Sequence, residues 1–168
     1  MFKLAKQAVT VVHLNIREEI HGEDKVLAED VKLNADMPND FLSQLSTTLK
    51  WSLYDKPDGT QGELITDAGH MPRLRYSQLG ILVWKASPAK MLFTIHGDKK
   101  AHDMVFEAVV GKVVLDCKDG GTVSVTFSAA VYPTAEESGR LAALLGQEQK
   151  VSVQPVSEKE PESGGDES

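Results

Sequence analysis

The chain has 168 residues and a formal net charge of −7, with 41% hydrophobic and 26% charged residues. This composition is typical of a soluble globular protein and excludes collagen-like, disulfide-rich and wholly disordered classes. The length predicts one domain with a core that needs no metal or disulfide, and no apolar run approaches the ~20 residues of a membrane helix. The single cysteine, Cys117, and the lack of a secretory cleavage signal predict the reducing cytoplasm of a bacterium or of a host cell.

The first third of the chain predicts a β-hairpin followed by a helix. Apolar and polar residues alternate over residues 8–20 and 25–37, as in strands with one solvated face. Pro38 ends the second strand, because proline cannot donate a hydrogen bond to a ladder. Leucines at helical spacing over residues 40–53 then predict an amphipathic helix.

The same order recurs near the C-terminus. Residues 104–117 predict a strand, residues 123–131 alternate as a second strand, and Pro133 follows them. The sequence Thr134–Glu137 is a capping box that opens a second leucine-striped helix. The two hairpin–proline–helix units raise the alternative of an internal duplication.

Between and after these units lie shorter strand patterns. Residues 73–85 are apolar on both faces near their end, which predicts a central strand covered by a helix, and residues 90–96 predict its neighbour. A short final strand is predicted at residues 151–153. We therefore predict an α+β fold with a mainly antiparallel sheet of six to eight strands and two amphipathic helices on one face. Residues 1–153 form the single domain, and residues 154–168 form a disordered acidic tail.

No catalytic motif is present. None of the five histidines is paired with another or with Cys117 at a zinc-site spacing, and no phosphate-binding glycine loop occurs. The nearest approach to a metal-dependent nuclease is Glu23, Lys25, Glu29 and Asp30, which flank a turn where charge is commonly only solvated. Lys118 lowers the pKa of the Cys117 thiol if the two interact, whereas a cysteine packed at a strand end is the simpler interpretation. We predict a protein that is not an enzyme and that needs no metal or cofactor.

The charge distribution points to a basic middle. Residues 70–112 carry 7 basic and 3 acidic side chains, a net of +4, whereas residues 1–69 carry 7 and 12, a net of −5. Cations interleaved with aromatic residues are typical of proteins that bind single-stranded nucleic acid. Phosphate contacts require these cations to share one exposed face; the alternative places Trp84 in the core and leaves the arginines merely solvated. The predicted nucleic-acid-binding residues are Arg73, Arg75, Tyr76, Trp84, Lys85, Lys90, Lys99 and Lys100.

An acidic C-terminal segment after a β-rich core resembles the layout of bacterial and phage single-stranded-DNA-binding proteins, although those bacterial tails end in a hydrophobic pair and this one ends Gly165–Ser168. The glycine turn at 119–121 and the short leucine helices are similar in style to small phage or prophage accessory proteins. The resemblance implies a non-enzymatic protein of phage nucleic-acid metabolism whose partner is single-stranded DNA. The alternative is a protein-binding accessory factor, or an inhibitor of a host nucleic-acid-handling or defence complex, that uses the acidic first half. Either hypothesis leaves a homo-oligomer open.

Overall fold

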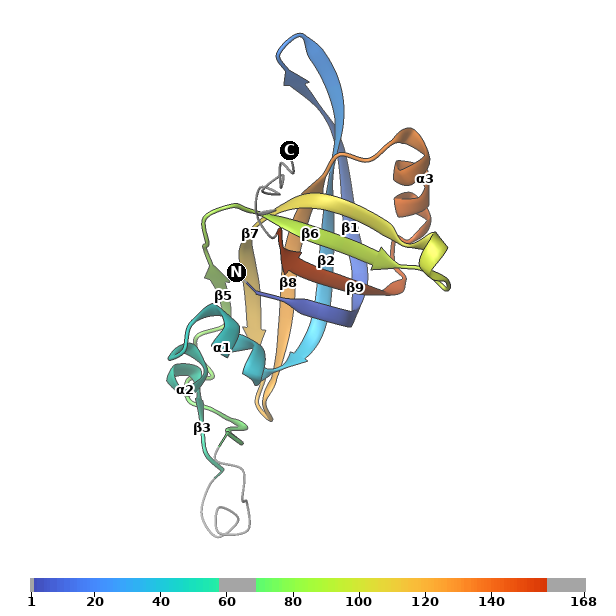
Figure 1. Ribbon diagram of the computed structural model, residues 1–168. Coiled ribbons are helices and arrows are strands. Elements are labelled where there is room, and N and C mark those ends of the chain that lie inside the picture. The colour runs from blue at the N-terminus through green and yellow to red at the C-terminus, as the bar shows by residue number, and fades with distance from the viewer. Residues whose placement is uncertain (1, 58–68, 157–168) are drawn as a thin grey trace, which may run out of the picture.

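The computed structural model describes residues 2–57 and 69–156 (Figure 1). The strands are β1 Leu4–His21, β2 Asp24–Pro38, β3 Tyr54–Asp55, β4 Arg73–Leu74, β5 Ile81–Trp84, β6 Ala89–His96, β7 Met104–Cys117, β8 Thr122–Val131 and β9 Glu148–Pro155. The α-helices are α1 Leu42–Leu45, α2 Leu49–Leu53 and α3 Ala135–Ala143, and 3₁₀ turns form at Asn39–Phe41 and Lys100–His102.

Six strands close into an antiparallel barrel. Each strand pairs with the next in the order β1, β2, β8, β7, β6, β9, and β9 pairs back with β1. Closure buries the inward face of each strand where it lies within the barrel. Each contributes fully buried side chains to the core, among them Val9, Leu33, Phe93, Leu115, Phe127 and Val153. The predicted antiparallel sheet is confirmed, and its closure removes most of the unpaired edges that an open sheet leaves.

The segment from residue 73 to 85 corrects our prediction of a central strand. It contains the short β4 and β5, and β5 pairs only with the C-terminal half of β7 (Val113–Asp116). The N-terminal half of β7 pairs with β6 on the same side, so β5 and β6 are two parts of one interrupted strand. The interruption occurs at Pro88, which cannot donate to the ladder. Consequently β5 is an edge strand, with Ile81 66% and Val83 51% exposed.

The two predicted amphipathic helices on one face are not found. Residues 40–53 form only short turns of helix, because Ser46 is extended (φ −154°, ψ 140°) and interrupts them. The Ser46 hydroxyl contacts the Thr48 hydroxyl at 3.3 Å, a local hydrogen bond that competes with helix formation. Among the residues that the structure describes, only α3 is a regular amphipathic helix, and its predicted capping box between Thr134 and Glu137 is confirmed.

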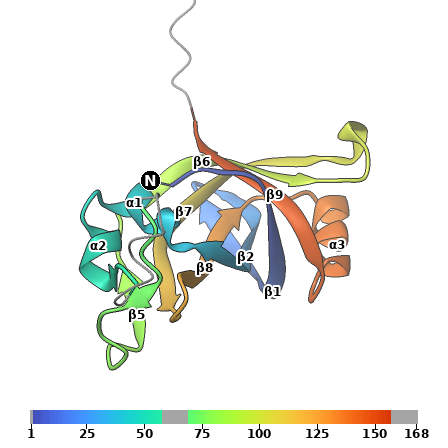
Figure 2. The same cartoon turned by 90° about the horizontal axis from the view of Figure 1, so that it is seen from below.

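The helices also lie on different sides of the barrel. α1 and α2 lie beside β5, whereas α3 lies at the far side next to β9 (Figures 1 and 2). Although both hairpins are followed by a proline and helical turns, the two units therefore differ in arrangement, and the internal duplication gains no support.

Two further predictions concern the C-terminal end of the domain and the absence of membrane helices. β9 extends to Pro155, two residues beyond the predicted domain end, and the rest of the predicted tail from residue 157 lies outside the described residues. Within residues 2–57 and 69–156, no helix combines the length and apolar character needed to cross a membrane.

Candidate functional site

The best candidate site is formed by Arg73, Arg75, Tyr76 and Trp51, hereafter the arginine site. β3 and β4 hold it as a two-residue ladder in which Asp55 is opposite Arg73. The ladder is anchored to the barrel through the buried Tyr54, whose hydroxyl donates to the Lys118 carbonyl at 2.7 Å. The Leu74 amide donates to Asp119 at 3.2 Å, so the glycine turn between β7 and β8 also fixes the position of β4.

One carboxylate organises the two arginines. Asp55 accepts from Arg73 Nη2 at 3.0 Å and from Arg75 Nη1 at 3.2 Å. The backbone amide of Lys56 and the Arg73 guanidinium hold the pKa of Asp55 below its usual value. Both guanidinium groups therefore lie within hydrogen-bond distance of the same carboxylate.

The side chain of Tyr76 lies beside these cations, and Trp51 contacts Arg75 through its backbone. Tyr76 is 58% exposed and lines an open concavity of about 410 Å³ with Asp55, Arg73 and Arg75. Trp51 is 54% exposed, and its carbonyl accepts from Arg75 Nε at 2.7 Å. The sequence analysis missed Trp51 because it lies within the leucine pattern of residues 40–53, which predicted a helix rather than a site. The arrangement offers guanidinium donors to anions and π-faces to planar groups.

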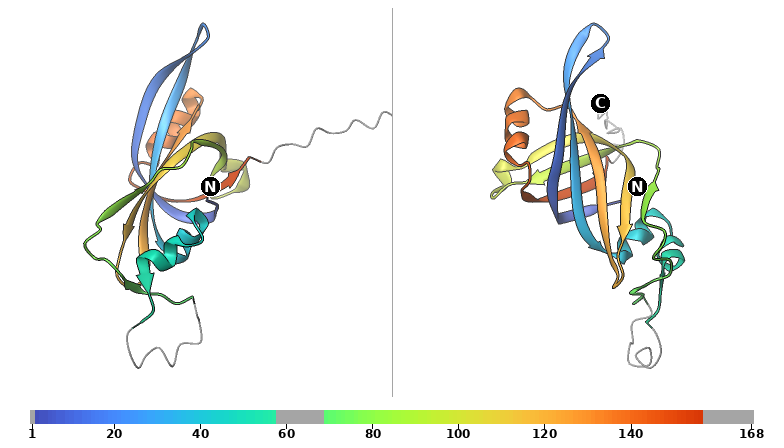
Figure 3. Two further views of the ribbon diagram at one scale, coloured as in Figure 1. Left: turned by 90° about the vertical axis from the view of Figure 1, so that its left-hand side faces the viewer. Right: turned by 180° about the vertical axis from the view of Figure 1, so that it is seen from behind.

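The remaining predicted residues do not join this site. Trp84 packs its ring against the core, while Lys85 and Lys90 are exposed where β5 ends and β6 begins. Lys99 and Lys100 lie in the β6–β7 turn, which Arg140 of α3 contacts through the His102 carbonyl at 2.7 Å. That turn and the β3–β4 ladder are at opposite ends of the molecule (Figures 1 and 3). The structure therefore does not bring the predicted cations to one common face.

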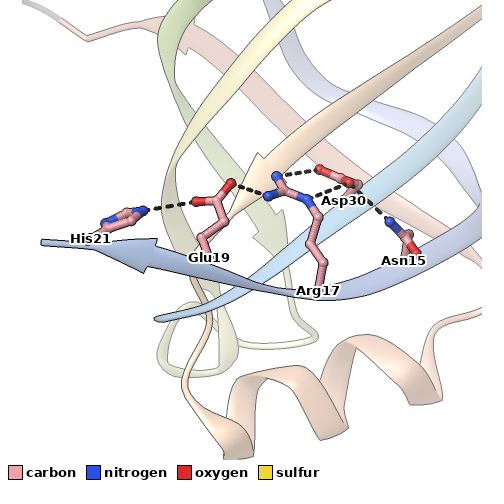
Figure 4. A network of polar contacts seen from close by, with 5 residues as sticks. All are labelled: Asn15, Arg17, Glu19, His21 and Asp30. Carbon is pink, nitrogen blue, oxygen red and sulfur yellow. Dashed lines mark hydrogen bonds and ion pairs between the residues drawn. The ribbon is translucent and has the colours of Figure 1, made fainter. Parts of the chain in front are cut away.

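A second polar cluster lies on the β1–β2 hairpin. Arg17 donates to Asp30 through Nε at 3.0 Å and through Nη2 at 3.2 Å, and it also pairs with Glu19 (Figure 4). Asn15 and His21 extend the network at its two ends, with His21 Nε2 3.0 Å from Glu19. Hydrogen bonds from Arg17, and then from His21 and Tyr132, lower the pKa of Glu19 to about 2. The network holds a carboxylate firmly ionised and satisfied, which is the signature of a fixed structure rather than of an acid–base catalyst.

The groups weighed for nuclease chemistry are divided between two faces. Asp30 points outward to Arg17, whereas the adjacent Glu29 is fully buried and accepts from the Ser138 hydroxyl at 2.9 Å. Among the described residues, Glu29 Oε1 has no hydrogen-bond partner. Successive residues of a strand point to opposite faces, so these carboxylates cannot share an ion. No group of three or more His, Cys, Asp or Glu side chains in the described part of the chain is placed to hold a metal.

The structure agrees with the simpler interpretation of Cys117, a cysteine packed at the end of a strand. Burial raises the pKa of its thiol, and Lys118 pairs with Asp116 at 2.6 Å. The thiol is therefore not activated as a nucleophile by its lysine neighbour.

Comparisons of the chain with protein-family models, with curated proteins and with solved structures find no match.

Proposed function

We propose that the protein is a non-enzymatic binding protein for single-stranded nucleic acid, with the arginine site as its contact. The observation that carries the proposal is the pair of arginines beside the exposed Tyr76 around one open concavity. Guanidinium groups bind phosphates in a bidentate manner, and aromatic rings stack on bases of any sequence. A single strand presents both groups, whereas a duplex hides its base faces.

The small size of the site sets the expected strength and salt dependence. Two phosphate contacts on a single strand give a slope of log K against log salt of about −1.4, at about 0.7 per contact. The affinity falls as salt rises, but less steeply than for a protein that uses all the predicted cations. This slope distinguishes the arginine site from the larger surface that includes Lys99 and Lys100.

The test is a fluorescence-anisotropy titration with labelled single- and double-stranded oligonucleotides at two salt concentrations. Removing both arginines (Arg73→Ala with Arg75→Ala) should weaken single-strand binding and flatten its salt slope. Because Arg75 also donates to the carbonyls of Trp51 in α2 and of Tyr54 in β3, thermal melting must show that this variant stays folded. Tyr76→Ala, which removes an exposed ring, should cost about 1–3 kcal/mol of binding free energy if a base stacks there.

The matched control removes the same charge at the other end of the molecule. Lys99→Ala with Lys100→Ala should leave affinity and salt slope unchanged. Equal losses in the arginine and lysine variants would show diffuse electrostatic attraction and contradict a defined site. A chain that binds no oligonucleotide at low salt would contradict the function itself.

The negative charge of the acidic tail should affect binding at the arginine site. Residues 157–168 contain five carboxylates and one lysine, and we expect them to compete with phosphates for the arginine site. A chain that ends at Val156 should then bind single strands more tightly than the full chain. Such a tail suits a protein of phage or prophage nucleic-acid metabolism that acts in the cytoplasm, and unchanged affinity would count against the competition.

A second candidate is a protein-binding accessory factor. It is favoured by the exposed apolar residues on and beside the free edge of β5, namely Leu79, Ile81 and Val83. An added strand from a partner pairs with such an edge. This candidate predicts no oligonucleotide binding, and Ile81→Lys should abolish partner binding while leaving the fold intact.

A further inference from the structure

The β1–β2 hairpin extends beyond the barrel as an arm, defined as residues 16–28. β1 pairs with β9 only as far as Thr10, and β2 pairs with β8 only from Glu29 onward. Within the arm the two strands pair only with each other, and the arm projects away from the barrel (Figures 1 and 3). A two-stranded hairpin is at best marginally stable in water, so an arm of this length requires additional support.

The two faces of the arm are very different. The outer face carries the Arg17–Glu19–Asp30 network, and the ring of Tyr132 covers it at 5.4 Å from His21. The inner face bears Ile16, 56% exposed, and Ile20, 72% exposed. These isoleucines continue the inward-facing side of β1, but no core reaches them.

The outer edge of β1 is also unused. Gly146 and Gln147 bond the backbone of Val11, and beyond that residue no backbone hydrogen bond reaches this edge from the described part of the chain. The two-residue turn Gly22–Glu23 makes His21 and Asp24 a hydrogen-bonded pair, so the amides and carbonyls of Ile16, Glu18 and Ile20 point outward along the edge. The edge has no proline, and it carries the exposed Ile16 and Ile20 together with the charged Arg17, Glu18 and Glu19, so a strand added to it must match both kinds of side chain. The free edge of β2 is shorter, because β8 pairs with β2 from Glu29.

We propose that this edge pairs with the same edge of a second copy of the chain, across a two-fold axis that passes by Glu18. Antiparallel pairing about Glu18 places Ile16 opposite Ile20 of the partner subunit, on the inner face. On the outer face it places Arg17 opposite Glu19 of the partner subunit. Each of these contacts occurs twice, because a two-fold interface is self-complementary.

The charge pattern selects this register. Centring the axis on Arg17 would oppose two arginines and place Ile16 against Glu18 of the partner subunit, and centring it on Ile16 would place Glu18 against Leu14 of the partner subunit. In the proposed register the two Glu18 side chains face each other, but Lys25 lies 3.6 Å from Glu18 in each copy and compensates for the repulsion. The end of the partner's arm then reaches the level of His13, just before the backbone bonds at Val11 begin.

Cysteine cross-linking of the full-length chain tests both the pairing and its register. In a Cys117→Ala background, Glu18→Cys should give a disulfide-linked dimer on oxidation, because residues opposite each other across an antiparallel pair lie within disulfide reach. Ile20→Cys is the matched control on the same exposed face. Its two copies would be separated by about 13 Å, four residues along the strand, and should not be linked.

Sedimentation equilibrium of the unmodified chain over a range of concentrations provides the second measurement. We expect a monomer–dimer equilibrium that Ile20→Lys shifts to monomer. Val105→Lys, at a 53% exposed position where β7 pairs with β6, should leave the equilibrium unchanged. A chain that sediments only as a monomer, or equal cross-linking of the two cysteine variants, would overturn the proposal. Neither result depends on the arginine site, whose variants should dimerise normally.

Discussion

Leu33 and Leu27 lie on the same strand, β2, and on the same inward-facing side, yet they have different surroundings. Leu33 lies in the barrel and is fully buried, whereas Leu27 lies in the arm and is 36% exposed. The alternation along β2 is the same at both positions, so it does not decide their burial. Burial of an inward-facing side chain requires strands on all sides of it. Only the part of β2 from Glu29 onward lies within the closed barrel. The comparison shows that an apolar periodicity identifies the face of a strand but not whether that face is covered.

Truncating the two leucines tests this comparison with the largest expected effect. Leu33→Ala leaves a cavity in the barrel and should lower the free energy of unfolding by about 2–5 kcal/mol. Leu27→Ala removes the same atoms from the partly solvated arm and should cost about 1 kcal/mol or less. Urea unfolding of the two variants at one protein concentration measures the difference. Similar losses would mean that the arm is packed in solution as tightly as the barrel.

Glu29 lies at the boundary between the barrel and the arm. Loss of its hydrogen bond to Ser138 should have the next largest effect on the free energy of unfolding. Ser138→Ala leaves a fully buried carboxylate without its donor and should cost about 1–3 kcal/mol of unfolding free energy. In a Glu29→Leu background the same serine change should cost much less, because no carboxylate then remains to be satisfied. Chemical denaturation of the four proteins forms a double-mutant cycle. A serine effect that is equal in both backgrounds would show that Ser138 acts through α3 alone.

The arm's polar network should have a smaller effect that depends on pH. Folding lowers the pKa of Glu19 and Asp30, chiefly through the hydrogen bonds from Arg17, so the folded state binds fewer protons than the unfolded state. This contribution is fully present above the ordinary carboxyl pKa and is lost as the pH falls from about 5 to 2. Arg17→Ala should therefore make thermal stability less dependent on pH in that window.

Arg140→Ala is the control for that pH series, because Arg140 donates to a backbone carbonyl rather than to a carboxylate. Its melting temperatures should follow the slope of the unmodified chain. If Arg17→Ala also leaves the slope unchanged, the network contributes nothing to the acid stability of the arm.

Local sequence signals predicted most of the secondary structure. The strand predicted at residues 104–117 matches the bounds of β7, and the Thr134–Glu137 capping box begins α3 as expected. The same signals gave wrong predictions at two places. Ser46 interrupted the leucine helix, and the apolar pattern of residues 79–84 suggested a central strand for what is an edge.

The candidate site was only partly accessible from sequence. Arg73, Arg75 and Tyr76 were identified by their spacing, and they do lie together. Trp51 was missed because it lies within the leucine pattern of residues 40–53, and it contacts the site through its carbonyl, which accepts from Arg75. The basic turn at Lys99 and Lys100 is close to the arginines in sequence but distant in space, because β6 carries the chain across the molecule between them.

The sequence by itself determined the strands, their turns and which face of each strand is apolar, because these depend on neighbouring residues and on backbone conformation. Only the tertiary structure decided that β9 joins β6 to β1 and that β8 pairs with β2, which closes the barrel. It also decided that the arm extends beyond that closure. These features depend on pairings between residues far apart in the chain, whose register is set by the simultaneous burial of all six inner faces.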